Sequence, residues 1–132
     1  MANISYNPDV KIINTELACL IGLNEAIALQ QLHYWIEKNK TAGVNFRDGR
    51  VWTFSTIQEY RDRDFPFWSF NTVRRTITSL ANMDFLIKGN YNRMKIDKTI
   101  WCAIDYNALE NWIAKNADKP SNPASLQNTI IE

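Results

Sequence analysis

The sequence predicts a mainly α-helical domain with a small β-hairpin, in the order helix, helix, strand, helix, helix, strand, strand, helix. Three observations lead to this fold class. Apolar residues recur at helical spacing, short β-branched and aromatic runs lie between those stretches, and capping or helix-breaking residues mark most boundaries. With 132 residues, 45% of them hydrophobic and 22% charged, the chain has the composition of one ordinary folded domain.

The first two predicted helices are separated by a glycine. Residues 14–21 have the pattern of a short helix, and Gly22 ends it at a position where a left-handed conformation is least costly for glycine. Asn24 is expected to cap a longer helix that runs to Lys38. The apolar residues of this helix fall on two faces, so we expect it to be sandwiched in the core.

The middle of the chain predicts a loop, a strand and a third helix. Residues 39–50 are polar and contain glycine, which favours a loop, whereas residues 51–54 (VWTF) are typical of a short strand. Ser55 and Gln58 form a capping-box pattern for a helix through about Arg63, and Pro66 prevents its continuation. The RDRD run just before this proline is expected to form a solvated ion network.

An amphipathic helix is predicted over residues 69–82, with Ser69 as its N-cap. Its apolar side consists of Phe70, Val73, Ile77, Leu80 and Ala81. Its polar side consists of Asn71, Arg75, Thr78 and Asn82, flanked by Arg74 and Ser79. No carboxylate occurs on this polar stripe, because the first acidic residue, Asp84, lies beyond the end of the helix.

Two strands and a last helix complete the predicted domain. Residues 85–90 and 99–104 have strand patterns, and the basic segment YNRMKIDK between them makes a hairpin with a long basic tip. Asp105 is expected to cap a helix through about residue 114, whose Leu109, Trp112 and Ile113 return to the core. The domain therefore spans residues 1–115, and residues 116–132 are expected to be a tail or the start of a linker.

This order of elements is that of a winged helix-turn-helix, in which the helix at 69–82 enters the major groove of DNA and the hairpin lies along the backbone. The charge distribution agrees, because residues 69–100 contain six basic and two acidic residues although the whole chain has a net charge of only +1. Arginine, asparagine and threonine bind base edges or phosphates. The candidate DNA-binding residues are Asn71, Thr72, Arg74, Arg75, Thr78, Arg93, Lys95 and Lys98.

Each of these residues also has a structural interpretation. Arg74 and Arg75 could be solvated residues or partners in intramolecular ion pairs. The basic residues of the hairpin could serve only to keep an exposed sheet edge from aggregating. Tyr91 could stack on a nucleotide or, as we favour, pack on its own hairpin, and Trp68 is expected in the core.

Enzymatic activity and a bound cofactor are not expected. His33 is the only histidine and is expected to pack as a neutral side chain, and no group of acids, cysteines and histidine has metal-ligand spacing. The four glycines are too scattered for a phosphate-binding loop. Cys19 and Cys102 are far apart in the sequence, which favours two buried thiols over a disulfide or a zinc site.

A membrane location is not expected either. The uncharged stretch at residues 26–36 is shorter than the roughly 18 residues that a membrane helix needs. The N-terminus has no basic segment followed by an apolar block, as a secretory signal would. These features predict a cytoplasmic protein.

Four segments together resemble a known family. They are LNEAIALQQLHYWIEKNK (residues 23–40), DGRVWTFSTIQEY (48–60), FPFWSFNTVRRTITSLANMDFLI (65–87) and KTIWCAIDYNAL (98–109). Over about residues 10–113 the chain resembles the N-terminal winged-helix domain of replisome-organiser proteins from phages and prophages of Gram-positive bacteria, which are akin to DnaD-type primosomal proteins. The FPFWS turn leading into an Arg-Arg helix is the most specific part of this resemblance.

The resemblance implies a non-catalytic role in the initiation of DNA replication. It implies binding to double-stranded DNA at or near an origin, self-association through the N-terminal segment and residues 51–54, and help in recruiting the replicative helicase through its loader. Proteins of this kind often carry a helical C-terminal domain after a linker, and residues 116–132 would begin that linker.

Two other functions are compatible with the same pattern. A transcriptional repressor on the winged-helix fold would differ only in its DNA target, which would be a promoter operator rather than an origin. A protein-interaction or dimerisation module would use the basic patch to bind an acidic partner and would have negligible affinity for duplex DNA at low salt.

Overall fold

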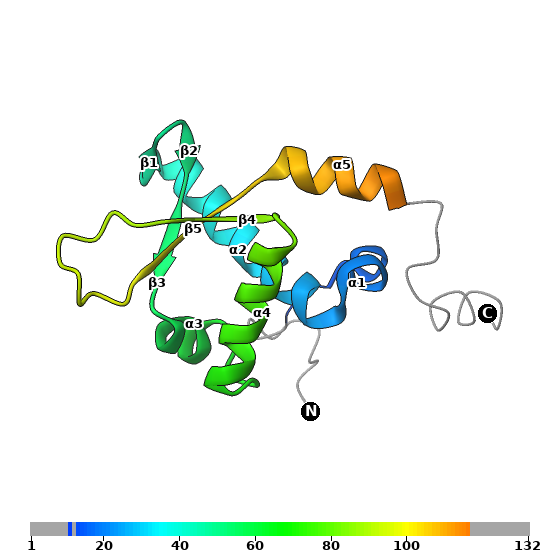
Figure 1. Ribbon diagram of the computed structural model, residues 1–132, viewed down its shortest axis with the longest axis horizontal. Helices are drawn as coiled ribbons and strands as arrows, with labels where there is room; N and C mark the ends of the chain where they lie inside the picture. Colours follow the sequence, from blue (N-terminus) through cyan, green and yellow to red (C-terminus); the bar gives the residue numbers. More distant parts are fainter. Residues whose placement is uncertain (1–10, 12, 117–132) are drawn as a thin grey trace, which may run out of the picture.

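A computed structural model of the chain describes residue 11 and residues 13–116. These residues form five helices and two small antiparallel sheets, arranged as in Figure 1. The helices are α1 (Thr15–Ile21), α2 (Leu23–Ala42), α3 (Ile57–Arg63), α4 (Phe70–Asn82) and α5 (Tyr106–Asn116). The strands are β1 (Phe46–Arg47), β2 (Arg50–Val51), β3 (Thr53–Ser55), β4 (Leu86–Gly89) and β5 (Ile100–Ile104).

The predicted order of elements is present, with one hairpin more than the sequence interpretation contained. The predicted loop at residues 39–50 is wrong in two places, because α2 continues to Ala42 and β1 pairs with β2. The β1–β2 turn is Asp48-Gly49, and both residues have positive φ, 52° and 75°. Asp-Gly favours the two-residue hairpin turn that needs this geometry, so the signal was present in the sequence.

Helix boundaries differ from the predictions by a few residues. Asn24 does not cap α2, since that helix begins at Leu23 directly after Gly22, whose φ is 112°. The capping box of α3 is one residue later than predicted: Glu59 N donates to Thr56 Oγ1 at 3.1 Å, and Thr56 N donates to Glu59 Oε1 at 2.8 Å. Ser55 instead belongs to β3.

The ends of the domain follow the predictions closely. Asn14 caps α1, accepting a hydrogen bond from Leu17 N at 3.0 Å, and Asp105 accepts one from Ala108 N at 3.0 Å at the start of α5. Helix α5 extends to Asn116, one residue into the predicted tail. The other residues of that tail, and the N-terminal segment up to residue 10, lie outside the described residues.

The three-stranded sheet has the order β3-β5-β4 and packs its inner face on the helices. Its outer face carries a second, aromatic cluster centred on Trp52 and Trp101. Gly89 on β4 lies against this cluster, and a Cβ at that position would come within 2.9 Å of the Trp52 ring. A residue without a side chain is therefore required where β4 passes the indole.

The main core lies between α2, α4 and the sheet. Helix α2 buries Leu29, Leu32 and Ile36 on one face, together with Ala26 and Ala28. On the other predicted face Ile27 is partly buried against the core, whereas Tyr34 is 49% exposed. The predicted sandwiching of α2 is therefore correct for Ile27 and wrong for Tyr34. Helix α5 turns Leu109 and Trp112 toward the core, where both are partly buried.

One of the two cysteines departs from its prediction. Cys102 on β5 is buried as predicted, but Cys19 is exposed. The reason is that α1 is a short surface helix that buries only Ile21 completely.

A buried carboxylate connects α2, α3 and β3. Asp64, at the end of α3, is 1% exposed and accepts hydrogen bonds from Gln31 Nε2 and Trp35 Nε1 of α2, each at 3.1 Å. Arg63 Nη2 lies 2.9 Å from Asp64 Oδ2 and also donates to Ser55 Oγ on β3 at 3.0 Å. A buried charge is stable only with such partners, so this network holds α3 in place.

The network corrects the prediction for the RDRD run. Only its first half, Arg61 with Asp62, forms an exposed ion pair, whereas Asp64 is buried and Arg63 lies with its guanidinium carbon 4.7 Å from the centre of the Trp35 ring. Charge pattern alone does not distinguish the two aspartates, because the partners of Asp64 come from a distant helix.

Asp64→Asn is expected to lower the free energy of unfolding by about 2–3 kcal/mol, because an amide cannot accept all the hydrogen bonds made to the buried carboxylate. Urea denaturation measures this change. The matched control is Asp62→Asn, which removes an exposed charge and should change stability by less than about 0.5 kcal/mol. Equal effects of the two substitutions would contradict the structural role of Asp64.

Two buried groups, Cys102 on β5 and Tyr60 on α3, lose their protons at unusually high pH. Burial raises the pKa of the Cys102 thiol to about 12, and burial is also the main cause that raises the pKa of Tyr60. The Tyr60 hydroxyl lies beside Thr53 and Cys102 but makes no well-formed hydrogen bond with a described residue. Both groups ionise at lower pH in the unfolded chain than in the folded one. The contribution of these two groups to the free energy of unfolding is therefore fully present below pH 9, the ordinary pKa of the thiol, and is lost as the pH rises above that value.

Tyr60→Phe is expected to raise the free energy of unfolding by about 1 kcal/mol, because it removes a buried hydroxyl without a partner. It should also reduce the loss of stability between pH 9 and pH 11, roughly the range in which both groups titrate when unfolded. Urea denaturation at a series of pH values measures both effects. A destabilised variant would mean that the hydroxyl is satisfied in solution.

Candidate nucleic-acid interface

Helix α4 begins and ends at residues suited to those positions. Ser69 caps it, accepting a hydrogen bond from Thr72 N at 3.1 Å, and Asp84 follows its end with a left-handed φ of 66°. The buried side of α4 consists of Val73, Thr76, Ile77 and Leu80. Thr76 was missed by the prediction, and its hydroxyl donates to Thr72 O at 2.7 Å and so is satisfied inside the core.

The apolar side of α4 is narrower than predicted. Phe70, expected in the core, is 44% exposed, whereas Ala81 packs against the core as predicted. Phe70 is the first residue of the helix and does not belong to the main core cluster.

The polar side of α4 is open to solvent. Exposed positions on this side are Asn71, Arg74, Arg75, Thr78 and Asn82. The arginines make only long hydrogen bonds, from Arg74 Nη2 to Asn71 Oδ1 at 3.5 Å and from Arg75 Nε to Asn71 O at 3.4 Å. Within the described residues the ion pairs are Arg61–Asp62 and Arg63–Asp64, so neither arginine of α4 is neutralised there.

Thr72 differs from the other candidate residues of α4. It is only partly exposed, and its hydroxyl lies 3.0 Å from Ser69 Oγ. The structure therefore places Thr72 in the N-terminal cap of the helix, at the edge of the exposed stripe rather than on it.

The turn between α3 and α4 is held from both sides. Arg61 Nε donates to Trp68 O at 3.0 Å, and the buried ring of Phe65 stacks on Trp68 with 4.9 Å between ring centres. Trp68 is partly buried against the core, as predicted for a core residue, whereas Phe67 is 52% exposed. These contacts determine the direction in which α4 leaves the turn.

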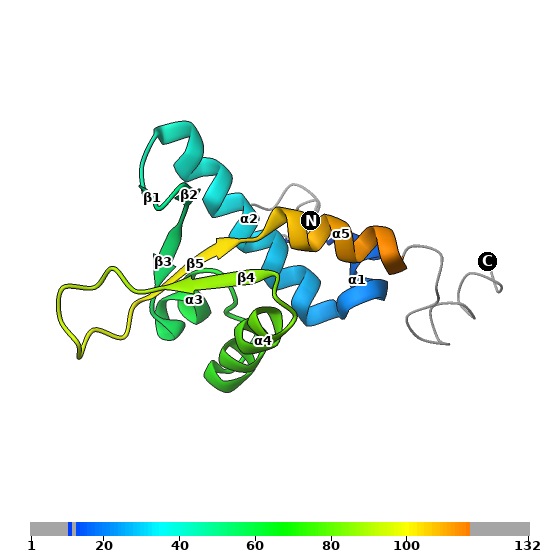
Figure 2. The ribbon, with the colours of Figure 1, turned by 45° about the horizontal axis from the view of Figure 1, so that its top comes forward.

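The loop between β4 and β5, residues 90–99, is called the basic loop here because it carries Arg93, Lys95 and Lys98. All three cations are exposed and form no ion pair within the part of the chain that the structure describes. In Figures 1 and 2 the basic loop extends away from the body of the molecule, and α3 lies between it and α4. The two halves of the candidate interface thus lie on either side of α3.

Hydrogen bonds across its base give the basic loop a defined shape. Asn92 Nδ2 donates to Thr99 O at 2.9 Å, and Trp101 Nε1 donates to Asn92 Oδ1 at 3.0 Å. Asp97 Oδ1 accepts from Thr99 N at 2.9 Å, and hydrogen bonding to Thr99 lowers the pKa of Asp97. Asp97 therefore keeps its negative charge beside the three cations.

Tyr91 packs at the base of the basic loop, as we favoured from the sequence. Its ring lies edge-on to Trp52 and Trp101, with centres 5.3 and 5.1 Å away, and its hydroxyl donates to Asp48 in the β1–β2 turn. The guanidinium of Arg47 lies 5.2 Å from the centre of the Tyr91 ring. Arg47 is a further exposed cation beside the basic loop, and the sequence interpretation missed it because it did not place the β1–β2 hairpin there.

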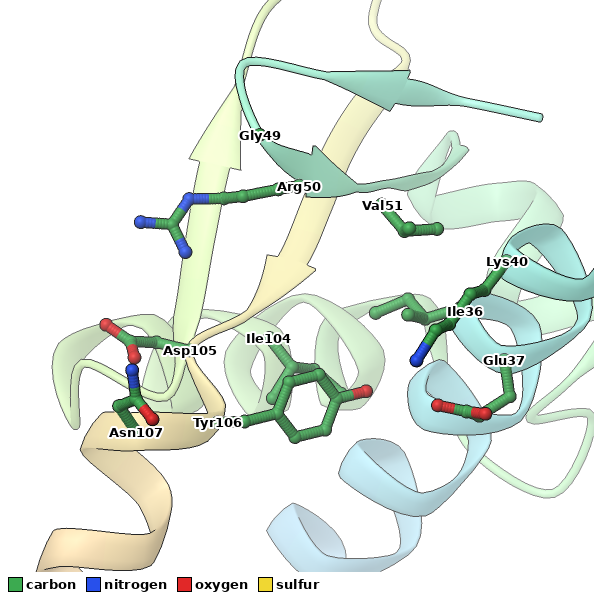
Figure 3. Close-up of a pocket in the computed structure, with 10 residues that line it drawn as sticks. All are labelled: Ile36, Glu37, Lys40, Gly49, Arg50, Val51, Ile104, Asp105, Tyr106 and Asn107. Atoms are coloured by element: carbon green, nitrogen blue, oxygen red, sulfur yellow. The ribbon is translucent and has the colours of Figure 1, made fainter. Parts of the chain in front are cut away.

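A separate cavity of about 260 Å³ lies between α2, β2 and the start of α5. Figure 3 shows Arg50 extending over Asp105 and Asn107, with Glu37 and Lys40 on the opposite wall. Charges of both signs therefore line this cavity. It contains none of the candidate DNA-binding residues.

The histidine and the other groups that could take part in catalysis or metal binding do not cluster in the described part of the chain. His33 Nδ1 lies 2.8 Å from Tyr106 Oη, and burial, with a smaller effect of Glu37, raises the pKa of that phenol to about 12. Among residues 11 and 13–116, no group of three or more His, Cys, Asp and Glu could hold a metal ion. No helix in this part of the chain is long and apolar enough to cross a membrane.

Comparison of the chain with protein-family models, with curated proteins and with solved structures gives no match.

Proposed function

We propose that this protein is a winged-helix DNA-binding domain that binds duplex DNA through α4 and the basic loop. In this proposal α2, β3, α3 and α4 form the helix-turn-helix unit, and β4, β5 and the basic loop form the wing. Helix α4 enters the major groove, which is wide enough for a helix, and the basic loop contacts the neighbouring backbone.

The observation that carries the proposal is the exposed, carboxylate-free stripe of α4. Two arginines and an asparagine stand open to solvent on its first two turns, without an ion pair in the described part of the chain. Asn71 can donate to and accept from adenine, and Arg75 can make a bidentate contact with guanine or hold a phosphate. If α4 served only a structural role, acidic residues spaced three or four positions from these arginines would stabilise the helix.

The biological role that we propose is the initiation of DNA replication in a phage or prophage, on the basis of the sequence resemblance. The protein would bind at or near an origin, self-associate and help to recruit the replicative helicase through its loader. Footprinting on the DNA that encodes and surrounds the gene separates the candidates: an initiator protects an origin, and a repressor protects a promoter operator. A protein-interaction module protects neither.

Arg75→Ala is expected to weaken duplex binding by about 1–3 kcal/mol. If Arg75 contacts a guanine, the loss should be largest for the preferred site and specificity should relax. If it contacts a phosphate, binding should weaken evenly for all sequences. Fluorescence anisotropy titration of labelled duplexes measures both outcomes.

The matched control is Arg50→Ala, which removes the same charge from β2. Figures 1 and 2 place β2 away from α4, and Figure 3 shows the Arg50 side chain directed toward Asp105 and Asn107 at the start of α5, so this variant should bind DNA as the parent does. Both arginines are exposed, and neither substitution should change stability by more than about 0.5 kcal/mol. An Arg75→Ala variant that binds every duplex as tightly as the parent would refute the role of α4.

The charge of the basic loop has its own test. Each phosphate neutralised by a cation contributes about −0.9 to the slope of log affinity against log salt concentration. Lys95→Gln with Lys98→Gln should therefore make the slope shallower by about 1.8. Lys40→Gln with Lys115→Gln, an equal loss of exposed charge on α2 and α5, should leave the slope unchanged. A slope that responds equally to both pairs would argue against contact through the loop.

A further inference from the structure

Two large apolar side chains stand at the tip of the basic loop. Ile96 is 79% exposed and Met94 is 63% exposed, which places them among the most exposed large hydrophobic residues of the described chain. They alternate with Arg93, Lys95 and Asp97 along the loop. Because apolar side chains gain free energy when they leave water, Met94 and Ile96 are suited to contact a partner surface.

The tip is held in shape before any partner binds. Asp97 N donates to Met94 O at 3.1 Å, which closes a turn around Lys95 and Ile96. Asn92 and Thr99 close the base of the loop, and Trp101 on β5 anchors Asn92. Since these bonds already restrict the loop, contact through Met94 and Ile96 would require little further loss of conformational entropy.

We infer that Met94 and Ile96 form an apolar wedge that enters the minor groove of duplex DNA, partly unstacks a base step and bends the duplex. The inference rests on the proposed DNA-binding function. With α4 in the major groove, the basic loop, which projects beyond α3, would reach the backbone and an adjacent minor groove. The minor groove is only about 6 Å wide and suits a thin loop tip. Exposed isoleucine and methionine side chains flanked by cations are the combination that such wedges use.

The charges of the tip fit this position. Arg93, Lys95 and Lys98 can each reach a phosphate at the rim of the groove, while the apolar pair contacts the bases and sugars, which carry no charge. Asp97 opposes phosphate, but its carboxylate is directed to Thr99 N inside the loop. The loop therefore keeps an excess of positive charge at the surface that would face DNA.

An anionic lipid surface is the other partner with matching chemistry, because it also binds cations and exposed apolar side chains together. DNA is favoured by the second half of the surface. The stripe of α4 presents Asn71, Thr78 and two arginines, which are hydrogen-bonding groups suited to base edges and phosphates and of no use in an apolar bilayer boundary.

Ligase-catalysed ring closure tests the wedge without knowledge of the DNA site. The probe is a linear duplex of roughly 100 base pairs with flexible TA steps, which is shorter than the persistence length of about 150 base pairs and closes poorly without a bend. The full chain should raise the yield of circles at low salt. The variant Met94→Ser with Ile96→Ser should abolish this increase and weaken binding to the same duplex roughly tenfold.

Two controls separate loss of the wedge from other losses. Leu23→Ser removes an apolar side chain that is 55% exposed at the start of α2 and should bend DNA as the parent does. The Lys95→Gln and Lys98→Gln variant should bind more weakly, yet at saturating protein it should still raise ring closure. Thermal melts should agree for all variants, because every substituted side chain is exposed.

Three other results would contradict the wedge, and each has a different cause. If the parent binds duplex DNA but does not raise ring closure, or if the serine variant raises it equally, the wedge is wrong and the proposed DNA binding stands. If the parent binds no duplex even at low salt, both fail. If the parent instead sediments with phosphatidylserine-containing vesicles, and the serine variant does not, the apolar pair serves a membrane surface and not DNA.

Discussion

Burial of the Asp64 carboxylate is the constraint on which the placement of α4 depends. The charge needs partners, and it finds them on α2 and in the neighbouring Arg63, which in turn reaches β3 through Ser55. Helix α3 therefore cannot shift without leaving a charge unpaired in the interior. The turn to α4 begins immediately after Asp64 and is held by Arg61 and the Phe65–Trp68 stack, so the position of the exposed stripe follows from this network.

The two halves of the proposed DNA surface are supported by different parts of the fold. Helix α4 is held by the main core and by α3, whereas the basic loop is held by the aromatic cluster on the outer face of the sheet. The β1–β2 hairpin adds to this second support, because Arg47 and Asp48 both contact Tyr91 at the base of the loop. A small hairpin thus stiffens the element that we propose as the wing.

Several parts of the structure were available to sequence reasoning because they depend on neighbours along the chain. The Ser69 cap and the two faces of α4 follow from residues three or four positions apart, and the 85–90 and 99–104 strands follow from local composition. The Asp48-Gly49 turn was equally local and was missed because the whole segment was assigned to a loop. Phe70 was misplaced because periodicity describes a face but not where the core beside it ends.

The sequence by itself determined the order of the five helices and of strands β3, β4 and β5, the capping of α4 and the absence of carboxylates from its polar side. All of these depend on residues close together in the chain. The tertiary structure decided which charges are buried and which are open. Asp64 and Asp62 differ in the side chains that other elements place around them. Similarly, Arg47 lies beside the basic loop because β1 and β2 fold back on the sheet. Burial and pairing are properties of distant residues that meet, and no local pattern encodes them.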